Sequence, residues 1–249
     1  MDFNLAGVDR LNTSKSVLRE RMTLFWSNHF VCGEKNVVYA QHYNNMLREY
    51  ALGNFRDFVQ AMSKEAAMIK YLNLRQNVKA QPNENFAREL MELFTLGPGH
   101  YTENDIKESA RAFTGYFNML DGTFRLRRFQ HDYGQKTFMG RTGNFNGDDI
   151  IDIILENRQC AKFICEKIYR YFVNETINDS HVTSMVNIFY RDYDISKLMR
   201  YVFTQDWFYD NDNIGNKIKS PIDYLVGLSR TVPFSLKNEK AVIKLQKLL

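Results

Sequence analysis

Cysteine is scarce in this chain: the 249 residues contain three, Cys32, Cys160 and Cys165. Their number is odd, and none of their spacings is that of a zinc site. Cys160 and Cys165 lie five positions apart on an expected helix, so their side chains point in different directions and do not easily bridge. We interpret all three as small apolar residues, an interpretation that does not define the redox compartment.

Long apolar runs are also missing. No stretch is long enough to cross a membrane, so no membrane span is expected. The first residues lack both the basic start and the apolar core of a signal peptide. Excess charge of one sign is missing too, because the formal net charge is only +4. We therefore expect no nucleic-acid partner, and we interpret the densest basic patch, at Arg125, Arg127 and Arg128, as a solvated strand face.

The common catalytic signatures are absent from the sequence. The glycine pattern matches neither a phosphate-binding loop nor a dinucleotide fingerprint, and we find no nucleophile elbow, HExxH or CxxC. With 44% hydrophobic and 25% charged residues, the composition is that of an ordinary globular protein. No motif therefore specifies a reaction.

Helical periodicity runs through almost the whole chain and predicts a mainly α-helical fold. The expected helices cover about 14–31, 36–52, 55–63, 65–72, the two helices within 83–115, 148–156, 160–172, 179–191, 195–203, 221–232 and 238–249. The exception is 116–130, which alternates around Asp121-Gly122 and predicts one β-hairpin. A glycine-rich loop over 131–147 follows. We expect a single helical domain over 1–249, with 131–147 as the place for any subdivision.

The segment from Asn83 to Gly115 reads as helix, glycine turn, helix. Its first helix has an apolar side and a charged side. The apolar side comprises Phe86, Leu90, Leu93 and Phe94, and the charged side comprises Asn85, Arg88, Glu89 and Glu92. Gly97 is expected to end this helix, and Thr102 with Asp105 to cap the next one. The charged side is either simply solvated, or it places the pair Glu89 and Glu92 in a pocket for acid–base or metal chemistry.

Two histidines add to this candidate site. His29 lies on the apolar stripe of its helix, where it is either a core histidine with one hydrogen bond or a ligand or base. His131 and Asp132 open the glycine-rich loop, and Lys136 follows four residues later. An adjacent His and Asp either ligate a metal or close a turn.

Several segments together resemble the bacterial family catalogued as domain of unknown function 1800. They are LRERMTLFWSNHF from Leu18, ENFARELMELFTLGPGHYTENDIKESARAFTGY from Glu84, HDYGQKTFMGRTGNFNGDDIIDIIL from His131, AKFICEKIYRYFV from Ala161 and KSPIDYLVGLSR from Lys219. The family's motifs fall on Trp26, Asn28, His29, Asn85, Arg88, Glu89, Glu92, His131, Asp132 and Lys136.

The resemblance implies an exported bacterial protein, periplasmic or extracellular, with no established activity. It also implies a protein longer than this chain. The stretch KAVIKLQKLL has no cap or polar tail behind it, so we expect a central part of a longer member, with self-association through the apolar surface of its truncated ends.

Two functions follow as hypotheses. The first is a structural or interaction module of an exported assembly, with a protein partner and a buried network of Arg88, Glu89, Glu92 and His131 that fixes helix register. Asn28, Asn85 and Arg88 are its structural polar residues. The alternative is a hydrolase, with catalytic candidates Glu89, Glu92, His131, Asp132 and Lys136. In that case His29, Glu89, Glu92 and His131 are candidate ligands of a divalent metal.

Overall fold

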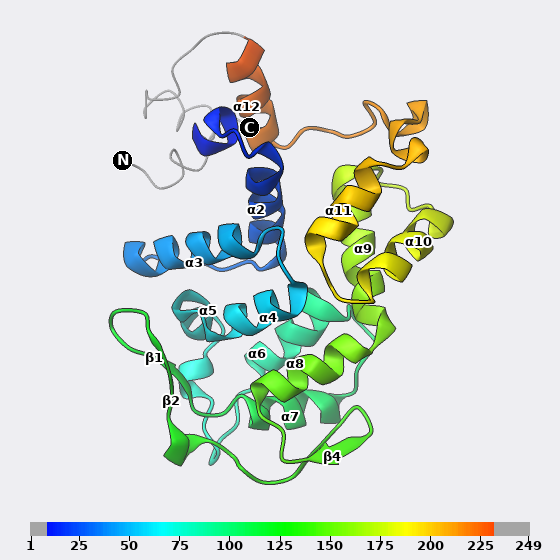
Figure 1. The fold of residues 1–249 in the computed structure, drawn as a ribbon. Helices are drawn as coiled ribbons and strands as arrows, with labels where there is room; N and C mark the ends of the chain where they lie inside the picture. The colour runs from blue at the N-terminus through cyan, green and yellow to red at the C-terminus, as the bar shows by residue number, and fades with distance from the viewer. Residues whose placement is uncertain (1–8, 232–249) are drawn as a thin grey trace.

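The computed structural model describes residues 9–231, and these form a mainly α-helical body (Figure 1). The α-helices are α2 (Val17–His29), α3 (Val37–Tyr50), α4 (Phe55–Lys64), α5 (Ala66–Tyr71), α6 (Asn85–Glu89), α7 (Glu103–Ala112), α8 (Gly147–Glu156), α9 (Arg158–Phe172), α10 (Asp179–Phe189), α11 (Ile195–Phe203) and α12 (Pro221–Thr231). The expected helix at 238–249, and with it the predicted self-association, lies outside the described residues.

Helices α2 to α11 divide into three groups in Figure 1. Helices α4 to α8 form the lower part, and α2 and α3 pack on each other above it. Helices α9, α10 and α11 pack in sequence along one side. None of the helices within residues 9–231 combines the length and the apolar character that crossing a bilayer requires.

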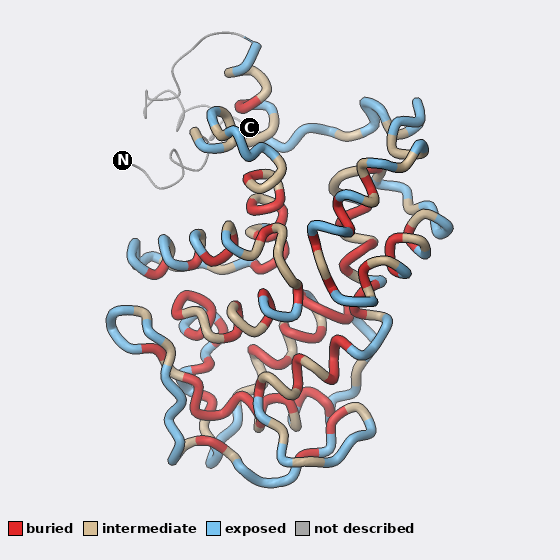
Figure 2. Tube along the Cα trace, viewed as in Figure 1, coloured by how far each residue is buried: buried red, intermediate tan, exposed pale blue. Residues whose placement is uncertain are grey.

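An aromatic core joins α2 to α4, which explains part of the chain's high phenylalanine content. Trp26 stacks on Phe30 at a centroid distance of 5.7 Å, and Phe58 forms T-shaped pairs with both rings, at centroid distances of 5.3 and 5.0 Å. The Nε1–H of Trp26 donates to the Ala51 carbonyl at 3.1 Å, so its one polar atom is satisfied inside the core. Figure 2 shows this burial along the inner faces of the helices. Cys160 and Cys165 are buried free thiols, as the apolar interpretation expects, whereas the free thiol Cys32 is only half-buried.

The helix after Asn85 changes its winding at Leu90. The segment Leu90–Thr95 is a π-helix, and the amide N–H of Leu96 donates to Met91 O, five residues back, at 2.9 Å. The extra residue per turn rotates Leu93 out of the apolar stripe, and its side chain is 46% exposed. Leu93 is thus separated from the other three residues of the predicted apolar side, since Phe86, Leu90 and Phe94 are buried.

Two β-hairpins are found among the described residues. The predicted one pairs β1 (Tyr116–Asn118) with β2 (Phe124–Leu126), with Gly122 at φ 91° in the connection. A second hairpin, β3 (Lys136–Phe138) with β4 (Arg141–Gly143), lies within the loop that the sequence pattern describes as irregular. Its turn at Met139-Gly140 has positive φ at both residues, as a tight hairpin requires, but Met is not a typical residue there.

Candidate functional site

Asp132 lies at the centre of a polar cluster between α7 and the loop after β2. Its Oδ2 accepts from Arg111 Nε at 2.7 Å, and its Oδ1 accepts from the Gly134 amide at 2.8 Å. Burial acts to raise the pKa of Asp132, but the hydrogen bonds from Arg111 and Gly134 outweigh it and hold the pKa below its ordinary value. The carboxylate is thus ionised at neutral pH and accepts hydrogen bonds from these two donors.

His131 and Lys136 are buried beside Asp132 and bind backbone oxygens. The Nδ1 of His131 lies 2.8 Å from Thr114 O; because a carbonyl only accepts, Nδ1 carries the proton. The ammonium of Lys136 donates to Asp132 O at 2.6 Å and to Gly134 O at 3.0 Å. Burial lowers the pKa of Lys136. Together these bonds close the 132–136 turn and tie it to the end of α7.

Two carboxylates of α7, those of Asp105 and Glu108, hold the second hairpin. Glu108 accepts from Thr137 N at 2.7 Å and pairs with Arg111 at 3.0 Å. Asp105 accepts from Met139 N at 2.8 Å. The carboxylates that contact the glycine-rich loop here are thus Asp105 and Glu108 of α7. The spacing of Asp105, Glu108 and Arg111, three residues each, was the sequence signal that could have identified them.

The charged side of the first helix makes different contacts. Arg88 binds Glu103 through both terminal nitrogens, at 3.0 and 2.9 Å, and its side chain is 39% exposed. Glu92 accepts from Tyr101 Oη at 2.7 Å. Glu89 is half-buried, and burial together with the neighbouring Glu92 raises its pKa. The Arg88 pairs lie at the surface and do not include His131, whereas Arg111, Glu108 and Asp132 form ion pairs that are less exposed.

The metal candidates are not assembled in the part of the chain that the structure describes. Among residues 9–231, no three His, Cys, Asp or Glu side chains lie together so that they could hold an ion. His29 binds the carbonyl of Phe94, whereas His131 binds that of Thr114. The geometry therefore places the two histidines in separate surroundings. Asn85 is half-buried, and its backbone N–H donates to Asn83 Oδ1.

A hollow of about 260 Å³ lies at the end of α2. Its walls include Phe25, the exposed Asn28 and His29 of α2, and Lys167 and Arg170 of α9. His29 is buried, and its Nδ1 lies 3.1 Å from Lys167 Nζ. Burial lowers the pKa of Lys167 to about 8. The sequence pattern had marked Asn28 and His29 but not Lys167, whose place beside them depends on α9 packing against α2.

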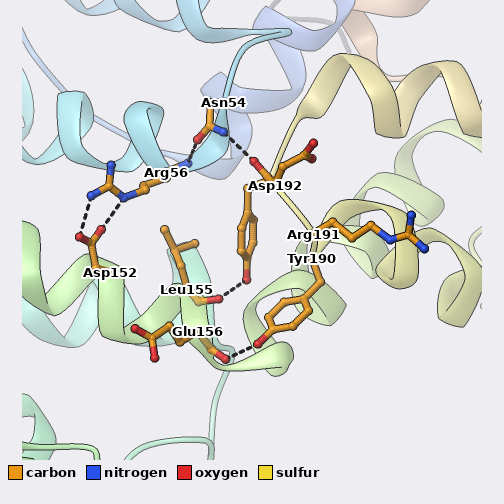
Figure 3. A pocket seen from close by; sticks show the side chains of 9 residues that line it. Asn54, Arg56, Asp152, Leu155, Glu156, Tyr190, Arg191 and Asp192 are labelled. Atoms are coloured by element: carbon orange, nitrogen blue, oxygen red, sulfur yellow. Dashed lines mark hydrogen bonds and ion pairs between the residues drawn. The ribbon is translucent and has the colours of Figure 1, made fainter.

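A larger hollow, of about 490 Å³, lies between α4, α8 and the connection from α10 to α11 (Figure 3). Arg56 forms two bonds of 2.6 Å to Asp152, and Tyr190 and Tyr193 donate to the Glu156 and Leu155 carbonyls at 2.6 Å. The tyrosines thus cap the carboxyl end of α8. These groups are engaged with one another, and we assign the hollow a structural role.

A sequence profile described as "Protein of unknown function (DUF1800)" matches residues 2–249. No significant match is found among curated proteins or among solved structures.

Proposed function

This chain belongs to the DUF1800 family of proteins of unknown function, and we propose that it is a helical interaction module that presents the β1–β2 hairpin to a protein partner. One observation carries the proposal. Leu120 and Phe129, at the tip and at the base of the hairpin, are 91% and 94% exposed. Figure 2 shows the hairpin connection as exposed, in contrast to the buried strand β1 that it follows.

Exposed apolar side chains are concentrated in this segment. Of the fifteen large hydrophobic residues exposed in residues 9–231, five lie within 119–133. They are Met119, Leu120, Leu126, Phe129 and Tyr133. Single exposed hydrophobics are normal, but several within one short segment favour a contact surface. Covering a Leu or Phe side chain is worth about 1.5–3 kcal/mol, so a partner gains most of its binding energy here.

The surface is also basic. Arg125, Arg127 and Arg128 are exposed, and the carboxylate of Asp132 is already paired with Arg111. The guanidinium of Arg127 lies 3.4 Å from the centroid of the Phe117 ring, which limits its motion. Arginines and aromatic rings of this kind are enriched at protein interfaces. The matching partner surface carries carboxylates around an apolar centre.

The hairpin is held at its base. The Arg127 amide donates to Gly115 O and the Gly115 amide to Asn77 O, each at 2.8 Å. The Lys79 amide donates to Gln130 O at 2.8 Å, and the Asp132 cluster follows directly. A surface that is ordered before binding loses less entropy on association. This assigns a role to His131, Asp132 and Lys136: they hold the contact surface in place.

The family resemblance supports an exported bacterial setting, and in our proposal the partner belongs to an exported assembly. Photo-crosslinking tests this. A benzophenone amino acid replaces Phe129 in the full-length protein in its own cell, and the products are identified by mass spectrometry. The matched control carries the same amino acid at Leu93, which is exposed on a different element.

We expect a defined protein product from position 129 that position 93 does not give. Reversing the charges of Arg125, Arg127 and Arg128 to Glu should abolish this product. Equal products from both positions would overturn the proposal. So would crosslinks to lipid alone, accompanied by binding to phosphatidylglycerol vesicles, because the surface would then face a membrane.

A further inference from the structure

The hollow at the end of α2 contains a lysine whose two fixed neighbours both accept hydrogen bonds. The Nε2 of His29 lies 3.0 Å from Phe94 O, so Nε2 carries the proton and Nδ1 has the lone pair. Lys167 Nζ lies 3.1 Å from that Nδ1 and 3.1 Å from Leu93 O. Two of its N–H bonds are therefore held in place whether the amine is charged or neutral.

The remaining position on Nζ is chemically distinct. A tetrahedral nitrogen that donates to His29 and Leu93 has one further direction, which holds a proton in the ammonium and the lone pair in the amine. The Phe163 ring lies beside Nζ, with its centroid 4.6 Å away, and Lys167 also lines the hollow, so a molecule inside the hollow can approach this nitrogen. Burial lowers the pKa of Lys167 to about 8, so about a tenth of the amine is neutral at pH 7.

The walls of the hollow suit a small acidic molecule. Phe25 and Tyr171 provide aromatic walls. The Arg170 guanidinium donates one N–H to Glu175 O at 2.8 Å, which leaves further donors on the same group. Lys217 also lines the hollow, with its ammonium bound to the Tyr171 carbonyl at 2.7 Å, and among the described residues that line the hollow Glu175 has the one carboxylate. At about 260 Å³, the space is smaller than the roughly 300–1,000 Å³ of sites for drug-sized ligands.

We propose that Lys167 is a nucleophilic amine that condenses with a small carbonyl compound bearing an acidic group, which Arg170 binds. The nitrogen lone pair forms a bond to the carbonyl carbon, and the carbonyl oxygen takes up protons. The carbinolamine then loses water: the two hydrogens of the amine leave on the former carbonyl oxygen, and an imine remains. No oxidant or reductant is needed. Desolvation and nearby cations are the usual means of activating a lysine for this step.

Reductive labelling tests the proposal on the full chain. The protein is treated with glyoxylate and cyanoborohydride at pH 7, and the modified lysines are quantified by peptide mass spectrometry. Lys162 is the internal control, because it lies on the same helix with a side chain 55% exposed. A pKa of about 8 in place of 10.5 raises the neutral fraction about 300-fold. Lower intrinsic nucleophilicity offsets part of this, and we expect labelling of Lys167 at least about tenfold faster than of Lys162.

A second arm tests the acid-binding group. Arg170→Met should slow labelling of Lys167 by glyoxylate but not by formaldehyde, which has no carboxylate. An unchanged thermal midpoint shows that the variant is folded. Labelling of Lys167 no faster than of Lys162 would overturn the nucleophile. Equal effects of Arg170→Met on both aldehydes would overturn the anionic ligand.

Discussion

Arg111 Nε lies 2.7 Å from Asp132 Oδ2, and this contact joins α7 to the segment that follows the β1–β2 hairpin. The same guanidinium binds Glu108, whose other role is to hold Thr137 of β3. One side chain therefore fixes the positions of both hairpins relative to α7. Because both side chains are largely shielded from water, loss of Arg111 leaves Asp132 without its counterion, whereas loss of Asp132 leaves Arg111 with Glu108 alone.

Asp132→Asn should destabilise the fold by about 1–3 kcal/mol, less than the 3–5 kcal/mol of a fully buried pair, because water reaches part of the contact. Asp192→Asn is the control, since it removes the same charge from an exposed pair with Lys197. Urea unfolding of both variants at pH 7 measures the difference. Equal small losses would mean that the Arg111 contact stabilises no more than a surface pair does.

The π-helix predicts opposite results for two neighbouring leucines. Leu93→Lys should change the free energy of unfolding by less than about 0.5 kcal/mol, because the side chain is already in solvent. Leu90→Ala should cost about 2–5 kcal/mol, because Leu90 is fully buried. Thermal melts of the two variants show which of the two leucines the π-helix turns towards the core. A large loss for Leu93→Lys would show that Leu93 faces the core after all.

Gly115→Ala should disrupt the base of the β1–β2 hairpin. Gly115 has φ +80°, and an added Cβ would lie 2.7 Å from Arg127 O. Gly99→Ala is the matched control, because Gly99 has φ +81° but no atom within 4 Å of the added Cβ. The control should lose only the stability that it costs to place an L-residue at positive φ, about 1–2 kcal/mol. Gly115→Ala should lose clearly more in urea unfolding, and equal losses would argue against a close backbone approach.

His29 should make the fold sensitive to acid. Burial, and then the charge of Lys167, lower the pKa of His29 well below 6.5, against the bond to Phe94 O. Below pH 6.5 the unfolded chain binds a proton at this position that the folded chain does not, so stability falls as pH falls. The slope from one such group is about 1.4 kcal/mol per pH unit. His29→Gln keeps a donor for Phe94 O and should flatten the fall between pH 7 and 5, whereas His100→Gln at an exposed position should not.

Glu89→Gln should stabilise the fold slightly at pH 7, by a few tenths of a kcal/mol. Burial and Glu92 raise the pKa of Glu89, so the folded state disfavours its charged form at neutral pH. The benefit should disappear near pH 4, where the carboxyl is protonated. Glu103→Gln is the control and should instead destabilise the fold at pH 7, because the hydrogen bond from Arg88 lowers the pKa of Glu103. A large loss for Glu89→Gln would instead indicate a network that depends on its charge.

Several elements were predictable because their signals are local. Thr102 and Asp105 form the predicted capping box, and Gly97 has φ +83° at the end of its helix. The turn at Asp121-Gly122 connects the predicted hairpin. Each of these depends on residues within about four positions of one another, whose backbone preferences act before any tertiary contact forms.

The π-helix and the partners of the candidate residues were decided by packing. The carbonyls of Leu93, Phe94 and Leu96 are bound by Lys167, His29 and Gln159, which are 63 to 74 residues away in sequence. These distant donors satisfy the carbonyl groups at the end of the π-helix. Likewise, the loop from His131 packs on α7, which brings Asp132 to Arg111.

The sequence by itself determined the mainly helical class, most helix ends, one hairpin, the family and which polar residues stand out. The tertiary structure alone decided which of these residues meet: Asp132 with Arg111 of α7, His131 with Thr114 just after α7, and His29 with Lys167. The physical reason is the range of the forces involved. Caps, turns and periodicity depend on neighbours along the chain, whereas a buried ion or hydrogen-bond partner is selected by whichever helix packs nearest.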